Sequence, residues 1–226
     1  MATRFYLPGT AASTPITPTP DAAWEDTSIL ARAMTSTAKI SDPMATVSFN
    51  DADATNKDIL FRQWISEPLT PGQTITGAQA IKAQVRVAEL TTFGEMFLAV
   101  GIRIINGTTV QKTVLAVTRD NVEAATGLTN RQFTATSAAT NYTTVADDRI
   151  VIEEGMGGDP ISGDHESTMR FGDAAASDLA ENDTATTDDN PWVQLTDTLT
   201  FGAAVPTHIG AVFSEPELPE ALMLPY

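Results

Sequence analysis

The sequence predicts an all-β fold, an antiparallel two-sheet sandwich that is jelly-roll-like and carries extended N- and C-terminal arms. Roughly eight to ten short segments have strand patterns, and Gly, Pro and Asn residues separate them. Residues 81–87 alternate strictly between apolar and polar side chains, as a half-buried strand does. Residues 97–105 and 109–117 flank Asn106-Gly107, the strongest short-range signal for a hairpin. Two packed sheets accommodate this many strands with loops of unequal length, which favours the jelly roll.

The other elements are predicted from shorter patterns. Residues 22–33 fit either a short helix capped by Asp21 or a strand laid on the sheet. Residues 155–163 are rich in glycine and are expected to form a flexible connection. Strand patterns also occur at residues 46–49, 59–65, 131–134, 142–145, 149–153, 168–171 and 192–201.

The chain divides into three parts. Residues 1–44 are expected to form an extended arm and a first strand, because closely spaced prolines in this part exclude a helix. Residues 45–202 hold the strand patterns of the sandwich core. Residues 203–226 are too apolar for a solvated tail and, with four prolines, too proline-rich for a helix or a central strand. This C-terminal arm either wraps over its own domain or docks in a groove of a neighbouring subunit.

Composition excludes several classes of partner and of site. The formal net charge is −16, from 29 acidic and 13 basic residues, which argues against binding to free nucleic acid or to an anionic membrane surface. The absence of cysteine excludes disulfides, thiolate catalysis and cysteine-based zinc sites. The N-terminus lacks the apolar core of a secretory signal, and the longest apolar runs are too short to span a bilayer. We therefore expect a soluble protein.

An acidic loop, residues 171–192, connects two predicted strands and contains six acidic residues but no Lys or Arg. Loops of this length usually have a function if they are ordered. Carboxylate oxygens are calcium ligands, although their spacing here does not match an EF-hand. The alternatives are a solvated loop and a turn that positions Trp192 on the sheet. The candidate calcium ligands are Asp173, Asp178, Asp183, Asp188 and Asp189.

No motif in the sequence indicates catalysis. It contains neither a phosphate-binding loop nor a dinucleotide fingerprint, and its two histidines fit no Ser-His-Asp order. The acid pairs Glu153/Glu154 and Asp147/Asp148 resemble the two carboxylates of a glycosidase, but adjacent strand residues point to opposite faces. Such pairs at strand ends are expected to be solvated. We predict that the chain is not an enzyme and has no cofactor other than calcium.

Three tryptophans allow a different kind of binding surface. Trp24, Trp64 and Trp192 could form a sugar-stacking platform on one face of the sandwich. Trp64 and Trp192 lie within strand patterns, however, which favours a role as anchors in the core or at an interface.

Several short stretches of the chain form a combination that is spread over most of residues 1–200. They are Arg4–Pro8, Ala23–Thr27, Asp148–Glu153, Phe171–Asp173 and Asp178-Leu179, and the most specific of them is the acidic loop ending in Asn190-Pro191-Trp192. In this combination the chain resembles a group of virion-associated proteins of tailed phages. The resemblance implies a structural component of a phage particle without a defined catalytic activity.

These observations predict a head decoration (cement) protein that clamps capsid subunits. Its partners would be the major capsid protein, other copies of itself, or both, in a virion assembled in the host cytoplasm. The alternative is a carbohydrate-binding sandwich on a tail or fibre that mediates host attachment. The clamp would bury the apolar residues of the C-terminal arm, which are Val212, Phe213, Leu218, Leu222, Met223 and Leu224.

Overall fold

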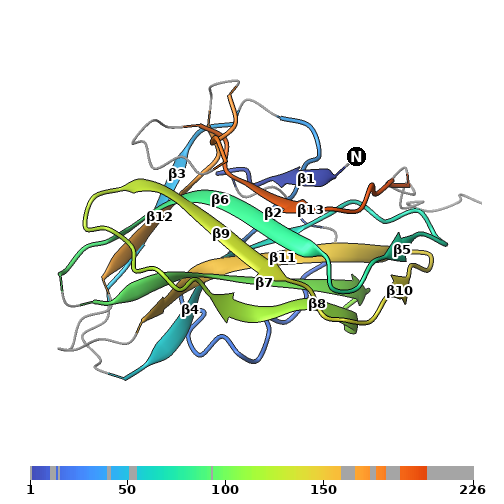
Figure 1. Cartoon of the computed structure of the whole chain (residues 1–226), viewed down its shortest axis with the longest axis horizontal. Helices are drawn as coiled ribbons and strands as arrows, with labels where there is room; N and C mark the ends of the chain where they lie inside the picture. The colour runs from blue at the N-terminus through green and yellow to red at the C-terminus, as the bar shows by residue number, and fades with distance from the viewer. Residues whose placement is uncertain are drawn as a thin grey trace, which may run out of the picture.

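The structure is a computed structural model of the chain (Figure 1). The described residues form thirteen strands and no helix. Accordingly, nothing in this part of the chain is a helix long and apolar enough to cross a membrane. The residues described are 2–10, 14, 16–39, 42–50, 55–92, 94–158, 166–173, 177–181 and 189–202.

Eight of the strands form two four-stranded antiparallel sheets that pack face to face. The order is β3-β12-β6-β9 in sheet A and β4-β11-β7-β8 in sheet B. The chain crosses from one sheet to the other at every connection between these strands except the β7–β8 hairpin. This is the jelly-roll arrangement, so the predicted fold class is confirmed. The strand bounds are Ala45–Phe49 (β3), Lys57–Ile65 (β4), Ala80–Glu89 (β6), Met96–Asn106 (β7), Thr109–Arg119 (β8), Thr129–Thr136 (β9), Asp148–Gly158 (β11) and Ser167–Phe171 (β12).

Five further strands are added to this body. β13 (Trp192–Leu195) and β12 pair with the same edge of β6, β13 with its first half and β12 with its second half. β1 (Thr3–Tyr6) pairs in turn with β13. β2 (Ala31–Met34) runs parallel to β4, the exception to the antiparallel pairing. The part of the chain expected as an N-terminal arm thus contributes one strand to each sheet. A small separate ribbon consists of β5 (Thr74–Ile75) and β10 (Tyr142–Thr143).

Two local predictions can be compared directly with the structure. The hairpin at Asn106-Gly107 is confirmed, and Gly107 has the left-handed φ of 58° that such a turn requires. Of the alternatives for residues 22–33, the strand is correct at its C-terminal end, where β2 begins. Asp21 caps no helix, because residues 22–30 form turns and a bridge and contain no helix; its side chain accepts a hydrogen bond from the Ala23 amide (3.0 Å) in the first of these turns.

The main core lies between the two sheets and contains large aromatic side chains from both. Trp64 on β4 and Phe171 on β12 meet edge to face, with ring centroids 4.7 Å apart. Alternate residues of β6, such as Val85 and Val87, point into the same core. The alternation of apolar and polar side chains along a strand therefore determines which side chains point into the core.

The predicted flexible connection at residues 155–163 is wrong at its start, because β11 continues to Gly158. A β-carbon on Gly155 would collide with the backbone carbonyl of Ile59 and lie 2.9 Å from the Trp24 ring. Gly157 has similarly close neighbours in Arg119 and Asp58. These glycines permit close packing within a strand, whereas the sequence pattern was interpreted as a flexible loop.

Replacing Gly155 by alanine is therefore expected to lower the free energy of unfolding by about 1–3 kcal/mol, since the overpacked backbone must move. Denaturant unfolding measures this loss. Gly127→Ala is the matched control, because a β-carbon there has no atom within 4 Å. Equal stabilities of the two variants would contradict the close packing at Gly155.

Candidate functional site

Residues 16–30, here called the N-terminal strap, lie across the outer face of sheet B. At one end Ile16 packs on an apolar cluster on that face, and at the other end Trp24 packs on a second one. After Trp24, Asp26 forms a bridge with Ile59 of β4, and its carbonyl accepts a hydrogen bond from the Leu60 amide (2.8 Å). The first cluster consists of Ile65, Ile105 and Val151, and the second of Leu60, Ala99 and Val117, on which Leu30 of the strap also packs.

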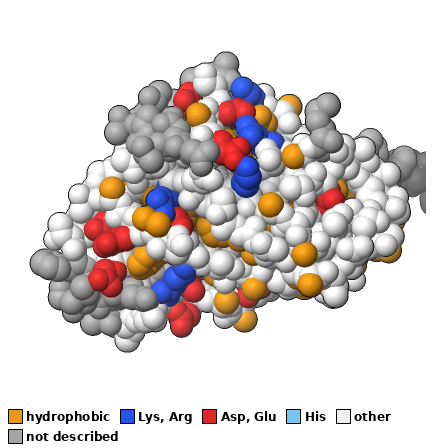
Figure 2. All heavy atoms as spheres, viewed as in Figure 1, with side chains coloured by type: hydrophobic (Ala, Val, Ile, Leu, Met, Phe, Trp, Pro, Cys, Tyr) orange, Lys and Arg blue, Asp and Glu red, His pale blue; other side chains and the backbone are white. Residues whose placement is uncertain are grey.

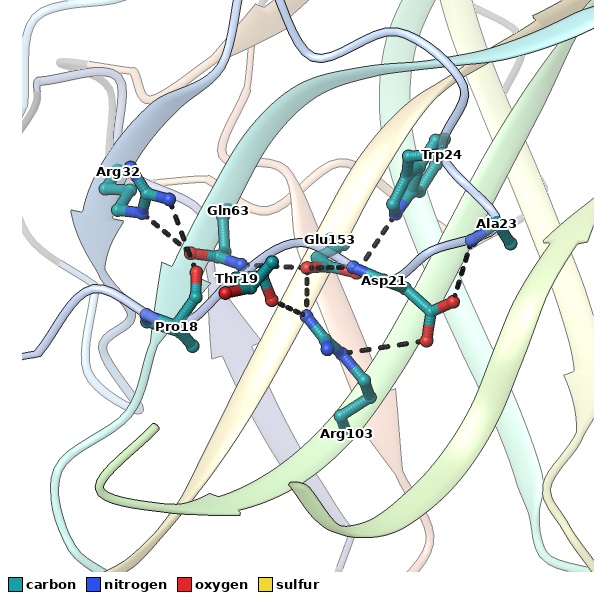
Figure 3. Close-up of polar contacts among 9 residues, drawn as sticks. All are labelled: Pro18, Thr19, Asp21, Ala23, Trp24, Arg32, Gln63, Arg103 and Glu153. Carbon is teal, nitrogen blue, oxygen red and sulfur yellow. Dashed lines mark hydrogen bonds and ion pairs between the residues drawn. The ribbon is translucent and has the colours of Figure 1, made fainter. Parts of the chain in front are cut away.

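Glu153 of β11 lies at the centre of this contact and is fully buried (Figure 3). Its carboxylate accepts hydrogen bonds from Gln63 Nε2 (2.8 Å), Trp24 Nε1 (3.0 Å) and the Asp21 amide (3.3 Å to each oxygen). It also forms an ion pair with Arg103 of β7, whose side chain is 5% exposed. A buried carboxylate is stable only when it is paired and hydrogen-bonded in this way.

Two arginines bind the carbonyl groups of the strap. Arg103 Nη2 donates to the Thr19 carbonyl (2.9 Å), and Arg32 Nη2 donates to the Pro18 carbonyl (3.3 Å). Arg32 Nε also donates to Gln63 Oε1 (3.0 Å), which connects both arginines to Glu153 (Figure 3). Proline-containing segments lack some amide donors but keep their carbonyl acceptors. The arrangement therefore binds an extended, proline-containing peptide segment.

The structure corrects the prediction that the Glu153/Glu154 pair is solvated. The two side chains do point to opposite faces of β11, but both residues are 0% exposed. Glu154 lies on the face of Ile152 and Met156, toward the main core. Among the described residues neither of its oxygens has a hydrogen-bond partner, and burial raises the pKa of its carboxyl to about 8.

The sequence contains one signal from which the buried charged groups could have been predicted, which is a charged residue within an otherwise apolar strand. Arg62 lies in the run Ile59–Ile65, and Arg103 lies between Ile102 and Ile104. The Arg62 guanidinium Nη1 donates to the Pro8 carbonyl (3.2 Å) and its charge centre is 5.2 Å from the Phe171 ring. Both arginines thus bind backbone carbonyls of the N-terminal part of the chain.

Residues 177–181 and 189–192 of the acidic loop lie against the outer face of sheet A, where two carboxylates meet basic side chains. Asp178 accepts hydrogen bonds from Arg4 Nη1 (2.8 Å) and the Tyr6 hydroxyl (3.3 Å), and pairs with Lys39 Nζ (3.1 Å). Glu181 pairs with Lys82 of β6. Figure 2 shows acidic and basic side chains side by side at the top of this face. The sequence prediction missed these basic partners, which come from distant parts of the chain.

The five candidate calcium ligands are not gathered in the part of the chain that the structure describes. Asp178 is surrounded by cationic groups, Asp173 is 8% exposed and Asp189 is half-buried. Asp183 and Asp188 lie outside the described residues. Within the described ranges, no three acidic or histidine side chains are grouped so that they could hold a metal ion. A calcium site in this loop stays a prediction.

Trp192 closes the base of the acidic loop. Its indole Nε1 donates to the Leu179 carbonyl (2.7 Å), and the Arg4 guanidinium lies 3.8 Å from its ring centroid on the sheet surface. The Leu179 amide in turn donates to the Asn190 carbonyl (3.0 Å), and the Asn190 amide to the Ser177 carbonyl (3.0 Å). The interpretation of residues 188–192 as a local structural element in which Trp192 anchors the strand to the sheet agrees with these contacts of Leu179, Asn190 and Trp192, while Asp188 lies outside the described residues.

Of the two interpretations of the tryptophans, the structure supports the favoured one, anchors of the fold, because no tryptophan presents an open ring face. Trp24 is 5% exposed, and Trp64 and Trp192 are 0% exposed. Each indole N–H also has an acceptor within the protein, which is the Pro8 carbonyl (3.3 Å) for Trp64. The three rings are anchors of the fold, so the carbohydrate-binding alternative loses the surface on which it was based.

The chain was compared with known proteins. No protein-family model and no curated protein matches it. Among solved structures, it is similar to an alpha-amino acid ester hydrolase, with 10% sequence identity over 88% of this chain and 36% of that chain and a TM-score of 0.50. It thus spans about a third of the hydrolase's length.

Two further solved structures match with lower scores. The first is a chain of infectious bursal disease virus, Gx strain, with 15% identity over 75% of this chain and 40% of that chain and a TM-score of 0.26. The second is a CocE/NonD family hydrolase from Staphylococcus aureus, with 12% identity over 87% of this chain and 34% of that chain and a TM-score of 0.26. At these scores neither match supports an inference about this chain.

The likeness to the ester hydrolase overturns the prediction that the chain is not an enzyme. That prediction was based on missing catalytic motifs, yet a sandwich of this fold is part of a hydrolase. The likeness concerns the fold, and it brings no catalytic residue and no substrate to this chain.

Proposed function

We propose that the chain is a structural component of a phage particle, a decoration protein attached to the capsid by extended segments. The observation that carries this proposal is the N-terminal strap. Its carbonyls are bound by Arg103 and Arg32, its Trp24 indole by Glu153, and its apolar side chains by the outer face of sheet B. This body therefore binds an extended, proline-containing segment within its own chain, which is the kind of contact that a clamp makes with a neighbour.

The C-terminal arm is the segment that we assign to the partner. The strap lies on the outer face of sheet B, and Asp178 and Glu181 of the acidic loop bind side chains on that of sheet A, so both faces already bind parts of their own chain. Residues 203–226, outside the described residues, supply apolar side chains for the contact. The partner is the major capsid protein, another copy of this chain, or both. The net charge of −16 keeps such a protein from binding the packaged DNA.

Deletion of residues 203–226 is expected to abolish binding to phage particles while the sandwich stays folded. The apolar contact would be lost, whereas the described core lies within residues 2–202. Immunolabelled electron microscopy of purified particles measures occupancy, and circular dichroism measures folding.

A pair of full-length variants separates loss of apolar contact from loss of length. Phe213→Ser with Leu222→Ser should reduce occupancy as the deletion does, whereas Glu215→Gln with Glu217→Gln should preserve it. Full occupancy of the truncated chain on particles would refute the proposed attachment.

A further inference from the structure

A hollow lies beside the point where the described chain ends. It consists of two cavities of about 200 and 320 Å³ that share Thr37 and Phe201. The second cavity extends toward Leu199 and the start of β1. Hydroxyl-bearing side chains surround a phenyl ring in the first cavity, which is lined by Thr35, Ser36, Thr37, Ser66, Glu67 and Phe201.

Phe201 is held in place at the centre of the hollow. Its ring packs edge to face on Phe5, with centroids 6.0 Å apart, and its backbone forms a bridge with Leu69. The next amide, that of Gly202, donates to the Pro68 carbonyl (2.8 Å). The half-buried ring is therefore a fixed aromatic floor on which a ligand can pack.

From this geometry we infer that the hollow receives residues 216–219 of the C-terminal arm of a second copy of the chain. This inference rests on the proposed function and names the partner of that arm. The first cavity is smaller than small-molecule pockets, which begin at about 300 Å³, and the second lies just above that limit; each suits single side chains of a peptide.

The chemistry of residues 216–219 matches the lining of the hollow. Pro216-Glu217-Leu218-Pro219 has the P-x-x-P spacing of segments that bind aromatic-lined grooves in the polyproline conformation. Carbonyls of such a segment need donors, and the hydroxyls of Thr35 and Thr37 can donate. The strap is bound by the same combination of apolar contact and donors to carbonyls, at Ile16 and Pro18.

The arm is long enough to reach a neighbour. Pro216 follows Gly202 by 14 positions, which span up to about 45 Å when extended. A compact body of this size has a radius of gyration of roughly 16 Å.

Site-specific disulfide trapping tests this inference, because the native chain has no cysteine. One tagged full-length chain carries Thr37→Cys, in the hollow, and a second with a different tag carries Leu218→Cys. The mixture is oxidised in solution and on particles. We expect a disulfide-linked pair with both tags, formed several-fold faster than with Leu90→Cys, a control residue that is 48% exposed and follows the opposite end of β6 from β13.

Three outcomes would overturn the inference: no linked pair, equal linking at Leu90→Cys, or closure within one chain when Thr37→Cys and Leu218→Cys are combined. The last outcome would assign the hollow to the chain's own arm. The failure of the proposed function is separate, since it appears as full occupancy of the truncated chain on particles. Absent linking combined with lost occupancy would leave the capsid protein as the partner.

Discussion

Replacement of Glu154 by glutamine is expected to remove the contribution of this carboxyl to the pH dependence of stability between pH 4.5 and 8. Burial raises the pKa of this carboxyl from 4.5 to about 8, and below pH 4.5 it is protonated in both the folded and the unfolded state. As the pH rises, only the unfolded state releases the proton, so the wild type loses stability until the folded pKa is passed. The full loss is about 5 kcal/mol.

Chemical denaturation at a series of pH values measures this effect as the difference between variant and wild type. The free energy of unfolding of the Gln variant should rise steadily relative to that of the wild type up to pH 8. Burial also raises the pKa of Glu89, to about 7, but this contribution is common to both proteins and cancels. Glu67→Gln, at an exposed position, should show a constant difference. A constant difference for Glu154→Gln would mean that its carboxyl is not held neutral by the core.

Replacement of Glu153 by glutamine is expected to lower the free energy of unfolding by about 3–5 kcal/mol, because it removes the buried partner of Arg103 and leaves only the longer ion pair with Asp21 (3.9 Å). Trp24 and the Asp21 amide would also lose a charged acceptor. The strap should therefore be released before the sandwich unfolds. Denaturant unfolding measures the first effect, and limited proteolysis within residues 16–30 measures the second.

A surface pair and a double variant complete this test. Glu181→Gln breaks the half-exposed pair with Lys82 and should cost less than about 1 kcal/mol. Glu153→Leu combined with Arg103→Met removes both buried charges and should recover much of the stability. If Glu153→Gln cost no more than Glu181→Gln, the buried pair would not be what holds the strap.

The sheets were predictable because their strands repeat a local pattern. The alternation in residues 81–87 and the turn at Asn106-Gly107 depend on neighbours within a few positions. The jelly roll then follows from the number of strands and the short crossings between sheets. The extra strands β1 and β2 are harder to predict from the sequence, because each is four residues long and its partner strand lies far away in the sequence.

The buried polar groups could not be predicted for the same reason. Glu153 resembles any acid at a strand end until Arg103, Gln63 and the strap are brought around it from three other segments. Gly155 resembles a loop residue until the Ile59 backbone approaches it. The sequence shows which charged groups are present, but the tertiary contacts determine which of them are buried.

The pairing of β1 with β13 has a consequence for how the chain is made. Thr3 pairs with Leu195, 192 positions later, so at roughly 5–20 residues per second the first strand waits about 10–40 s for its partner to leave the ribosome. The first half of β6 also gains β13 only then. Sheet A is therefore completed only after β13 has been synthesised, at the slow rate typical of non-local β pairing. The shortness of β1 and the charge of Arg4 limit aggregation during that interval.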